Sequence, residues 1–564
     1  MVSQPRYGCF CDLLGTISHP RRLFTPIAGL PCTTVMTFFL AALLTPLAID
    51  VWPLPHAITS GSISIAVIPS ATFFALDDAH SPLLNAAFER YMLLTFPHEV
   101  GSADGGTGGL SGLSVAVRDL DESHPTLEID ESYELSVTAA AATLKAKTVF
   151  GALRGLETFS QLVEFDFTSE AYTIPNAPLS IHDAPRFPHR GLMIDTSRHF
   201  QPLASIRAII DSLPYAKLNV LHWHVVDKQS FPLRSESNPK LWDGAYDLHS
   251  RYTHADVRSI VEYARLRGVR VFPEFDTPGH ADSWCVGYPE LCPSAECRTP
   301  LDVTRNGTFA LIDRLFAECT GRRTSRRGDP AGLFPDAFLH LGGDEVNTRC
   351  WTWTPRIREW LKAHSMTADD GYAFFTKRVA AIAIAQGRRP IQWSEVYDHF
   401  KTALPKQVIV HVWKSVTNVT EVVASGYDVL RNVGYNNVSW YLDNLNVPWD
   451  HVYANDPCDG VPDSLCHKIL GGHGEMWGET VDASDLQQTV WPRLGAIAEK
   501  LWSARADTHN TADAAARMHT FRCRLNERGV AAAPVGNANA RSAPPHPGAC
   551  LQQRRRLLAR SEMS

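Results

Sequence analysis

Short apolar runs that alternate with helix-like segments are the feature that most restricts the fold of this chain. From about Arg190 onward, eight runs read as strands: Gly191–Asp195, Asn219–Val226, Val269–Phe275, Phe338–Leu341, Pro390–Trp393, Val408–Trp413, Asp428–Asn432 and Lys468–Gly472. Between them lie segments with helical periodicity: Leu203–Leu213, His254–Arg267, Phe309–Cys319, Tyr372–Gln386 and Leu486–Trp502. Strands that are separated mostly by helices predict a (β/α)8 TIM barrel, a closed parallel sheet covered by helices.

The residues before the barrel predict a separate small α/β domain. Ser62–Ile68, Leu113–Val117 and Tyr133–Val137 alternate like strands, and Ala139–Val163 reads as an Ala-rich helical stretch broken near Gly151. At 564 residues the chain is too long for one ordinary domain. We therefore expect a leader over residues 1–50, an N-terminal α/β domain over 51–182, the barrel over 183–530 and a C-terminal tail over 531–564.

The leader contains an apolar run, Thr33–Ile49, that follows Arg21 and Arg22. Its length and basic flank favour a signal peptide, while an uncleaved signal anchor in the membrane is the alternative. Entry into the secretory pathway, with a lysosomal, vacuolar or extracellular destination, agrees with the sequons at Asn306 and Asn418, where we expect glycosylation.

Twelve cysteines also fit an oxidising compartment. Cys458 and Cys466 could close a small loop, and Cys523 and Cys550 could tie down the tail. An odd set surrounds the central acids: Cys285, Cys292, Cys297, Cys319 and Cys350. A zinc site is the competing interpretation, but no paired CxxC spacing supports it.

The charge balance argues against one class of partner. The 53 basic and 60 acidic residues give a net charge of −7. A protein that binds nucleic acid needs a basic surface, so we do not expect nucleic acid as a partner.

Acids, histidines and tryptophans follow the predicted strands. The strand ends read Asp195-Thr-Ser-Arg-His, His222-Trp-His with Asp227, Glu274-Phe-Asp276-Thr-Pro-Gly-His280, Asp344-Glu345, Trp393-Ser-Glu395, Trp413, Tyr441 and Trp477-Gly-Glu479. In such barrels the carboxyl ends of the strands carry the chemistry. The sequence therefore predicts a site at this mouth.

The segment AFLHLGGDEV lies at the centre of that prediction. An apolar run ends in two glycines, which tolerate a sharp bend, and the adjacent carboxylates Asp344 and Glu345 follow. Taken alone, this dipeptide favours a helix N-cap with an acidic first turn. The other polar strand ends favour a catalytic pair.

Six motifs occur in this order along the chain: PRFPHRGLMIDTSRHF, HWHVVDKQSFP, EFDTPGHADSW, HLGGDEV, WYLD and EMWGE. Together they resemble the β-N-acetylhexosaminidases of glycoside hydrolase family 20. The wording is nearer to plant and protist forms than to the animal one. The resemblance implies an exo-acting enzyme that removes terminal N-acetylglucosamine or N-acetylgalactosamine from glycans, needs no cofactor or metal, and uses the substrate's own acetamide as nucleophile.

The resemblance also implies roles for three residues. Glu345 would be the general acid and base, a role best served by a carboxyl whose pKa is raised by burial and a neighbouring negative charge. Asp344 would hold the acetamide nitrogen and offset the charge of the oxazolinium ring. Tyr441 would donate to the acetamide oxygen.

Further residues match the family's sugar pocket. We expect substrate contacts from Arg190, Trp393, Trp413, Asp443, Trp477 and Glu479, and a supporting pair, Asp276 with His280, that tunes Glu345. A homodimer is expected by family analogy only. Two alternatives stay open: a catalytically silent sugar-binding or adhesion protein, and a narrower N-glycan-trimming or disaccharide-releasing glycosidase on the same scaffold.

Two segments depart from the family's wording. Lys228 stands where plant forms usually carry a small polar residue, and His473-Gly474-Glu475 replaces a GGEAC-like sequence. Because Trp477 and Glu479 are kept, we expect altered surroundings with activity retained.

Overall fold

The computed structural model describes residues 49–77, 80–100, 109–321, 332–432, 434 and 438–536. Residues 1–48 of the predicted leader, the predicted tail beyond residue 536 and, within that tail, Cys550 lie outside these ranges. Within the described residues, no helix is long and apolar enough to cross a membrane.

The N-terminal domain is a mixed sheet that packs two helices. Its strands are β1 (Ala57–Val67), β2 (Phe74–Leu76), β3 (Leu113–Asp119), β4 (Tyr133–Val137), β5 (Ala142–Thr148), β6 (Glu164–Asp166) and β7 (Ala171–Asp183), in the order β1-β7-β4-β5-β3-β2 with β6 beside β7. The helices are α1 (Pro82–Thr95) and α2 (Val149–Leu162). A single cluster of buried apolar side chains joins the sheet and both helices.

The prediction of one broken helix over Ala139–Val163 is wrong. Its first part is strand β5, in which Ala142 and Leu144 face the core. The helix α2 starts only after Thr148, whose side chain accepts a hydrogen bond from the backbone N–H of Gly151. Alanine has a high helix propensity, but propensity is a small energy, and pairing with β3 and β4 overrides it here.

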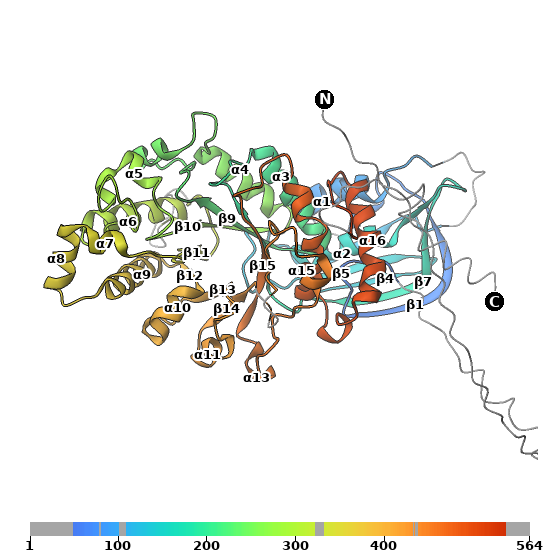
Figure 1. Cartoon of the computed structure of the whole chain (residues 1–564). Helices are drawn as coiled ribbons and strands as arrows, with labels where there is room; N and C mark the ends of the chain where they lie inside the picture. Colours follow the sequence, from blue (N-terminus) through green and yellow to red (C-terminus); the bar gives the residue numbers. More distant parts are fainter. Residues whose placement is uncertain are drawn as a thin grey trace, which may run out of the picture. The chain divides into compact units, whose positions relative to one another are not determined.

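The predicted barrel is confirmed. Eight parallel strands close in the order β10-β11-β12-β13-β14-β15-β8-β9 (Figure 1). They are β8 (His189–Asp195), β9 (Val220–Val226), β10 (Arg270–Phe275), β11 (Phe338–His340), β12 (Arg389–Trp393), β13 (Ile409–Val412), β14 (Asp428–Arg431) and β15 (Ile469–Met476).

Helices surround the barrel and its mouth. They are α3 (Leu203–Ser212), α4 (His254–Arg265), α5 (Trp284–Gly287), α6 (Asn306–Thr320), α7 (Arg349–Trp353), α8 (Pro355–Ala363), α9 (Ala368–Ala385), α10 (Ser394–Phe400), α11 (Val419–Ala424), α12 (Trp449–Tyr453), α13 (Asp463–Cys466), α14 (Leu486–Val490), α15 (Arg493–Trp502) and α16 (Thr511–Glu527). The predicted helix Leu486–Trp502 is divided into α14 and α15, because Pro492 cannot continue a helix.

Two layers of side chains fill the barrel. One is apolar and consists of Val220, Phe272, Phe338, Ile391, Ile409 and Leu430. The other is polar and fully buried: His189, His222, His340, His411 and His473, with Glu274 and Glu475. Burial lowers the pKa of His222 to about 3 and the pKa of both His340 and His411 to about 4, so these three rings are neutral near neutral pH.

Disulfides connect the loops around the barrel. Cys458 pairs with Cys466, as predicted. The odd set of five resolves into two bonds, Cys285–Cys292 and Cys297–Cys350, and Cys319 is left as a buried thiol.

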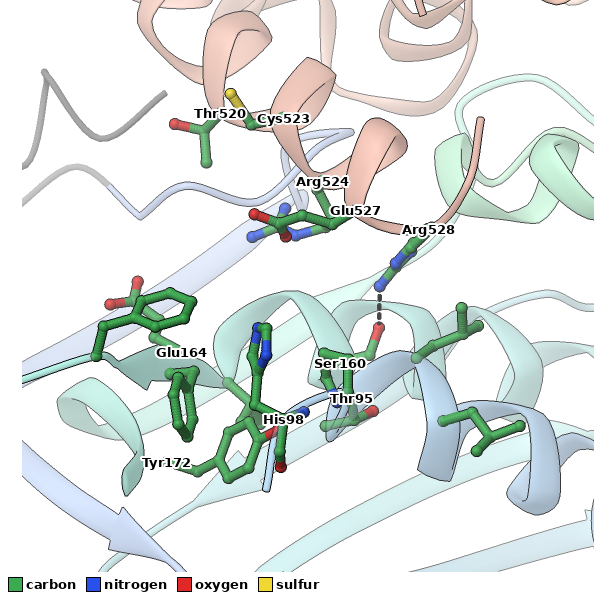
Figure 2. Close-up of a pocket in the computed structure, with 16 residues that line it drawn as sticks. Thr95, His98, Ser160, Glu164, Tyr172, Thr520, Cys523, Arg524, Glu527 and Arg528 are labelled. Atoms are coloured by element: carbon green, nitrogen blue, oxygen red, sulfur yellow. Dashed lines mark hydrogen bonds between the residues drawn. The ribbon is translucent and has the colours of Figure 1, made fainter. Parts of the chain in front are cut away.

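The helix α16 packs against the N-terminal domain (Figure 1). A cavity lies between them, and its volume is about 150 Å³. Figure 2 shows the side chains that line it. The guanidinium of Arg528 donates to Glu157 at 2.8 Å and to Ser160 at 2.8 Å, and Arg524 donates to Gln161 at 3.0 Å. Because these cations bind neighbouring protein groups, we assign this cavity to domain packing.

Arg190 belongs to the same domain contact, and its prediction as a sugar-binding residue is wrong. It is the second residue of β8, at the opposite end from the mouth, and is fully buried. Its guanidinium donates to Glu131 of the N-terminal domain at 2.7 Å and to the carbonyls of Phe187 and Lys217. Glu131 also accepts from Arg154 at 2.8 Å. Arg190 therefore joins the two domains.

We expect Arg190→Met to lower the free energy of unfolding by about 3–5 kcal/mol, because Glu131 loses one partner of a buried ion pair. Urea unfolding measures the loss. Lys147→Met is the control, since its pair with Asp130 is exposed and such pairs contribute about 0–1 kcal/mol. If Arg190→Met keeps its stability but no longer binds ligand at the mouth, Arg190 is a binding residue and the assignment to the domain contact is wrong.

Candidate active site

The carboxyl ends of the barrel strands surround a pocket of about 370 Å³. Its lining side chains are Arg198, His280, Asp344, Glu345, Trp393, Trp413, Tyr441, Asp443, Trp477, Glu479 and Thr480. All the residues predicted for the pocket and its support are in this set except Arg190 and Asp276. Arg198 and Thr480 were not predicted as site residues.

The chain enters the pocket from β11 through a glycine turn. Gly342 and Gly343 have φ values of +64° and +98°, which favour glycine. The backbone N–H of Gly343 donates to Asp276 at 2.8 Å. No helix is capped by the acids that follow, because α7 begins at Arg349 and its N-cap is Thr348. The helix-cap interpretation is therefore wrong.

Asp344 lies at the base of the pocket beside Asp276. Both carboxyls are buried, and burial raises the pKa of each above its usual value. The charge of Asp344 raises the pKa of Asp276 further. Asp344 Oδ1 is buried and has no hydrogen-bond partner. The site thus presents an unpaired acceptor to whatever enters it.

Glu345 points out at the rim of the same turn. Its φ is +48°, and 59% of its side chain is exposed. Glu345 Oε2 lies 3.6 Å from His280 Nε2, and this contact lowers the pKa of Glu345 below its usual value. The expected rise in the pKa of Glu345 is therefore wrong for the ligand-free site, where the neighbouring charge is positive and water reaches the carboxyl.

His280 supplies that positive charge. Burial opposes its protonation, but the charges of Asp276, Asp227 and Asp344 raise the pKa of His280 to about 12. The ring nitrogen Nδ1 lies 3.0 Å from Asp227 Oδ2. The hydrogen bond of His280 thus goes to Asp227, and Asp276, its expected partner, acts on it through charge.

Arg198 takes the position in the pocket that Arg190 was expected to hold. It lies three residues beyond β8 and is nearly buried. Its guanidinium lies 3.1 Å from Asp195 and 2.7 Å from Asp227, 3.8 Å from Glu479, and 5.0 Å from the ring of Trp477. These contacts with buried acids hold the guanidinium at the pocket wall. The strand-end pattern Asp195-Thr-Ser-Arg-His was the signal that could have identified it.

Aromatic rings form the other walls. Trp393 is buried and donates its indole N–H to Glu274 at 2.8 Å. Trp413 donates to Glu395 at 2.7 Å, and its ring stacks on Tyr441 with centroids 6.1 Å apart. These anchors hold the ring faces in place, so an apolar sugar face or an acetamide methyl can pack between them.

The opposite rim carries two further acids. Burial and the charge of Glu479 raise the pKa of Asp443 to about 6, and Asp443 Oδ1 has no hydrogen-bond partner. Glu479 is half exposed, and its side chain is 53% accessible. Both carboxylates are available to accept from hydroxyl groups of a ligand.

The remaining predicted residues lie outside the pocket. Asn306 is the exposed first residue of α6, and Asn418 is the exposed N-cap of α11. Lys228 is exposed as well. The departures His473 and Glu475 are buried inside the barrel.

One cluster beside the pocket has metal-ligating side chains: Asp227, Asp276 and His280. The guanidinium of Arg198 lies 2.7 Å from Asp227 Oδ2, and His280 carries a positive charge. These cations already neutralise the carboxylates, so a metal ion does not fit there.

A barrel mouth with a carboxylate at the rim, a buried acid beneath it and aromatic walls around both is the arrangement of a glycoside hydrolase. Residues 187–505 match the model of the glycosyl hydrolase family 20 catalytic domain, and residues 51–162 match a beta-acetyl hexosaminidase-like domain. The chain belongs to glycosyl hydrolase family 20.

Relatives extend over most of the chain. Beta-hexosaminidase 1 of Arabidopsis thaliana is 43% identical over 529 residues, which cover 89% of this chain and 94% of the relative. The beta subunit of mouse beta-hexosaminidase is 38% identical over 515 residues, covering 86% and 91%. Among solved structures, the Flavobacterium johnsoniae chitobiase has a TM-score of 0.72 at 30% identity, covering 86% of this chain and 73% of that one.

We expect Gly342→Ala to damage the turn that carries the acids. The added Cβ would lie 1.8 Å from Asp276 Oδ1 at a φ of +64°. Left-handed strain of about 1–2 kcal/mol and overpacking of about 1–3 kcal/mol should together lower the free energy of unfolding. Urea unfolding measures this loss.

Gly426→Ala is the matched control. Gly426 has a φ of +88°, and no atom lies within 4 Å of the position that an added Cβ would take. Only the backbone strain of about 1–2 kcal/mol applies there. Equal losses in the two variants would show that Asp276 is not displaced by the new methyl group.

Proposed function

We propose that this protein is a β-N-acetylhexosaminidase that removes terminal, non-reducing N-acetylglucosamine or N-acetylgalactosamine from glycoconjugates or chitooligosaccharides. The observation that carries the proposal is the unpartnered Asp344 Oδ1 at the base of an aromatic pocket. A buried acceptor is costly unless it receives a hydrogen bond, and the N–H of a 2-acetamido group supplies one.

The reaction proceeds by substrate assistance. The acetamide oxygen attacks the anomeric carbon as the glycosidic C–O bond breaks, and the departing oxygen takes the proton of Glu345. Glu345, now ionised, accepts a proton from water, which attacks the same carbon and opens the oxazolinium ring. Two displacements at one carbon retain its configuration, and no protein nucleophile is needed.

Asp344 and Tyr441 act on the acetamide. The carboxylate of Asp344 accepts from the acetamide nitrogen and offsets the positive charge that develops on the ring. Tyr441 donates its hydroxyl to the acetamide oxygen and aims it at the anomeric carbon. Burial and the charge of Glu475 raise the pKa of Tyr441 well above its usual value, which keeps the phenol protonated and able to donate.

Substrate binding reconciles the exposed Glu345 with its role. The general acid must be protonated at the start of the reaction, whereas His280 favours its ionised form in the free site. A sugar that covers the rim excludes water from Glu345, and desolvation favours the neutral carboxyl. The same His280 then stabilises the carboxylate after proton transfer.

Three side chains are placed to hold the sugar hydroxyls: Arg198, Asp443 and Glu479. The Nε of Arg198 and the Oδ1 of Asp443 are buried without hydrogen-bond partners, so each can pair with a hydroxyl group. Trp393, Trp413 and Trp477 enclose the ring and the acetamide methyl.

The alternatives are less well supported. A silent sugar-binding protein would not need Asp344, Glu345 and Tyr441 together in one pocket. The relatives that match over most of the chain are named as beta-hexosaminidases. A narrower N-glycan-trimming or disaccharide-releasing enzyme shares the same chemistry and differs in the preferred glycan.

We also propose that the protein enters the secretory pathway and acts in a lysosome, a vacuole or outside the cell. Three disulfides within the described residues support an oxidising compartment. Glycosylation at the exposed Asn306 and Asn418 is part of this proposal. A homodimer is supported by similarity to relatives that are named as subunits.

A panel of aryl glycosides tests the proposed function. The wild-type enzyme should hydrolyse the N-acetyl-β-glucosaminide at least about a hundredfold faster than the β-glucoside, which lacks the acetamide. Asp344→Asn should reduce kcat for the N-acetylglucosaminide by about 10²–10³-fold and leave the slow glucoside reaction nearly unchanged. Equal rates on both wild-type substrates would refute substrate assistance, and no hydrolysis of either would refute the enzyme.

The positive charge of His280 gives a pH-dependent prediction. Protonated Glu345 is the active form, so kcat/KM falls as the pH rises through the pKa of Glu345 in the free enzyme. His280→Gln removes the cation that lowers this pKa, and the basic limb should therefore move to higher pH.

His254→Gln removes a histidine of α4 that does not line the pocket, and this variant should leave the limb in place. Its ring pairs with Glu318. A basic limb that stays put, or moves to lower pH, in His280→Gln would contradict the assigned contact between His280 and Glu345.

A further inference from the structure

The segment His473-Gly474-Glu475 departs from the family's wording, and none of its residues lines the pocket. His473 and Glu475 are fully buried on β15, inside the barrel. Imidazoles from other strands lie beside them. Such a concentration of polar groups in a closed interior needs partners to be stable.

Three histidines converge in this interior. His222 comes from β9, His411 from β13 and His473 from β15. One ring nitrogen of each lies within 4.8 Å of those of the other two. The ring centroids of His411 and His473 are 4.9 Å apart, and those of His222 and His473 are 5.3 Å apart.

Several ring nitrogens of these three histidines lack hydrogen bonds. Both ring nitrogens of His222, Nε2 of His411 and Nδ1 of His473 are buried without a partner. Glu475 Oε1 lies 3.2 Å from His411 Nε2 and 3.5 Å from His473 Nδ1, and Glu475 Oε2 is also unpartnered. His222 Nε2 lies 2.9 Å from Glu274 Oε2. These carboxylate oxygens and ring nitrogens therefore form a compact group of electron-pair donors in the closed interior of the barrel.

We propose that His222, His411, His473 and Glu475 bind one divalent transition-metal ion of the Zn²⁺ type. Three imidazoles and one carboxylate are a four-ligand set that Zn²⁺ prefers, with ligands about 2.0–2.2 Å from the ion. An ion at their centre would pair the unpartnered nitrogens and balance the charge of Glu475. This proposal does not depend on the proposed reaction.

Neighbouring side chains contact Glu475 and the ring nitrogens of His411 and His473 that would face away from the ion. Asn432 donates its side-chain N–H to Glu475 Oε1 at 2.8 Å, and His411 Nδ1 lies 3.2 Å from His340 Nε2. His473 Nε2 contacts His189 Nε2. Groups of this kind orient metal-bound imidazoles and fix which nitrogen faces the ion.

Gly191 provides the space for His473. A Cβ at this position of β8 would lie 2.2 Å from His473 Cδ2. The competing cluster, His222 with Glu274 and His340, is less suitable. Glu274 already accepts from the indole of Trp393 and lies 2.8 Å from His224 Nδ1, so its oxygens are engaged.

The ion would be structural and closed to substrate. It would join β9, β13 and β15 across the barrel. His411 stacks on the underside of Trp393 with centroids 4.3 Å apart, so the ion would stiffen the base of the sugar pocket without touching the sugar. A closed four-ligand site leaves no position for a catalytic water.

Metal analysis of the full chain tests the proposal. We expect protein purified from zinc-supplemented medium to retain about one zinc per chain after dialysis against a weak chelator. Chelator-treated protein that is reloaded with Co²⁺ should show the visible absorption of a four-coordinate ion. Reloading should also raise the thermal midpoint, because the ion binds the folded state.

Variants locate the ion. His473→Gln removes one ligand and should reduce retained zinc by about tenfold or more. His254→Gln is the control, since it removes a buried histidine outside the barrel interior and should leave zinc and the Co²⁺ spectrum unchanged.

Two outcomes would overturn the proposal. One is a folded wild-type chain that retains no zinc and takes up no Co²⁺. The other is zinc that remains in full in a folded His473→Gln chain, since that metal would lie elsewhere. If His473→Gln does not fold, the Co²⁺ spectrum of the reloaded wild type decides the matter alone.

Discussion

The site depends on one buried cation held between acids. Arg198 lies between Asp195 and Asp227, and Asp227 also pairs with His280, which contacts Glu345. Each charge is buried at a cost that only its neighbours offset. The position and the pKa of Glu345 therefore depend on Arg198, although these two side chains are joined only through Asp227 and His280.

A second constraint is the crowding of Asp276 and Asp344. Two carboxyls in a buried pocket cannot both ionise without a large penalty, so they act as one titrating unit. The glycines at 342 and 343 make this approach possible, since a side chain at Gly342 would occupy the place of Asp276 Oδ1. In the GGDE motif, the glycines thus provide the backbone turn that lets Asp344 lie close to Asp276, and this closeness couples the ionisation of the two carboxyls.

The sequence predicted the barrel and most of the pocket, because strand ends of a parallel barrel gather at one mouth. Arg190 shows the limit of that argument. It is the second residue of β8, whereas Arg198 follows the end of that strand by three residues, so the two lie at opposite ends of the barrel. The boundaries of β8 decide which of the two arginines lies at the mouth, and the sequence motif does not define those boundaries. The lowered pKa of Glu345 could not be predicted from the sequence either, because it arises from His280, which is distant in sequence.

The histidine cluster could not be predicted from spacing either, because its members come from three strands. One local rule does connect its departures from the family. Side chains two residues apart on a strand face the same side, so His473 and Glu475 both enter the interior while Gly474 faces the helices. The two changed residues therefore meet the same partner, His411, at 4.9 Å between rings and 3.2 Å from the carboxylate. A change at only one of these positions would leave a buried polar side chain without its neighbour. We therefore interpret His473 and Glu475 as one altered site.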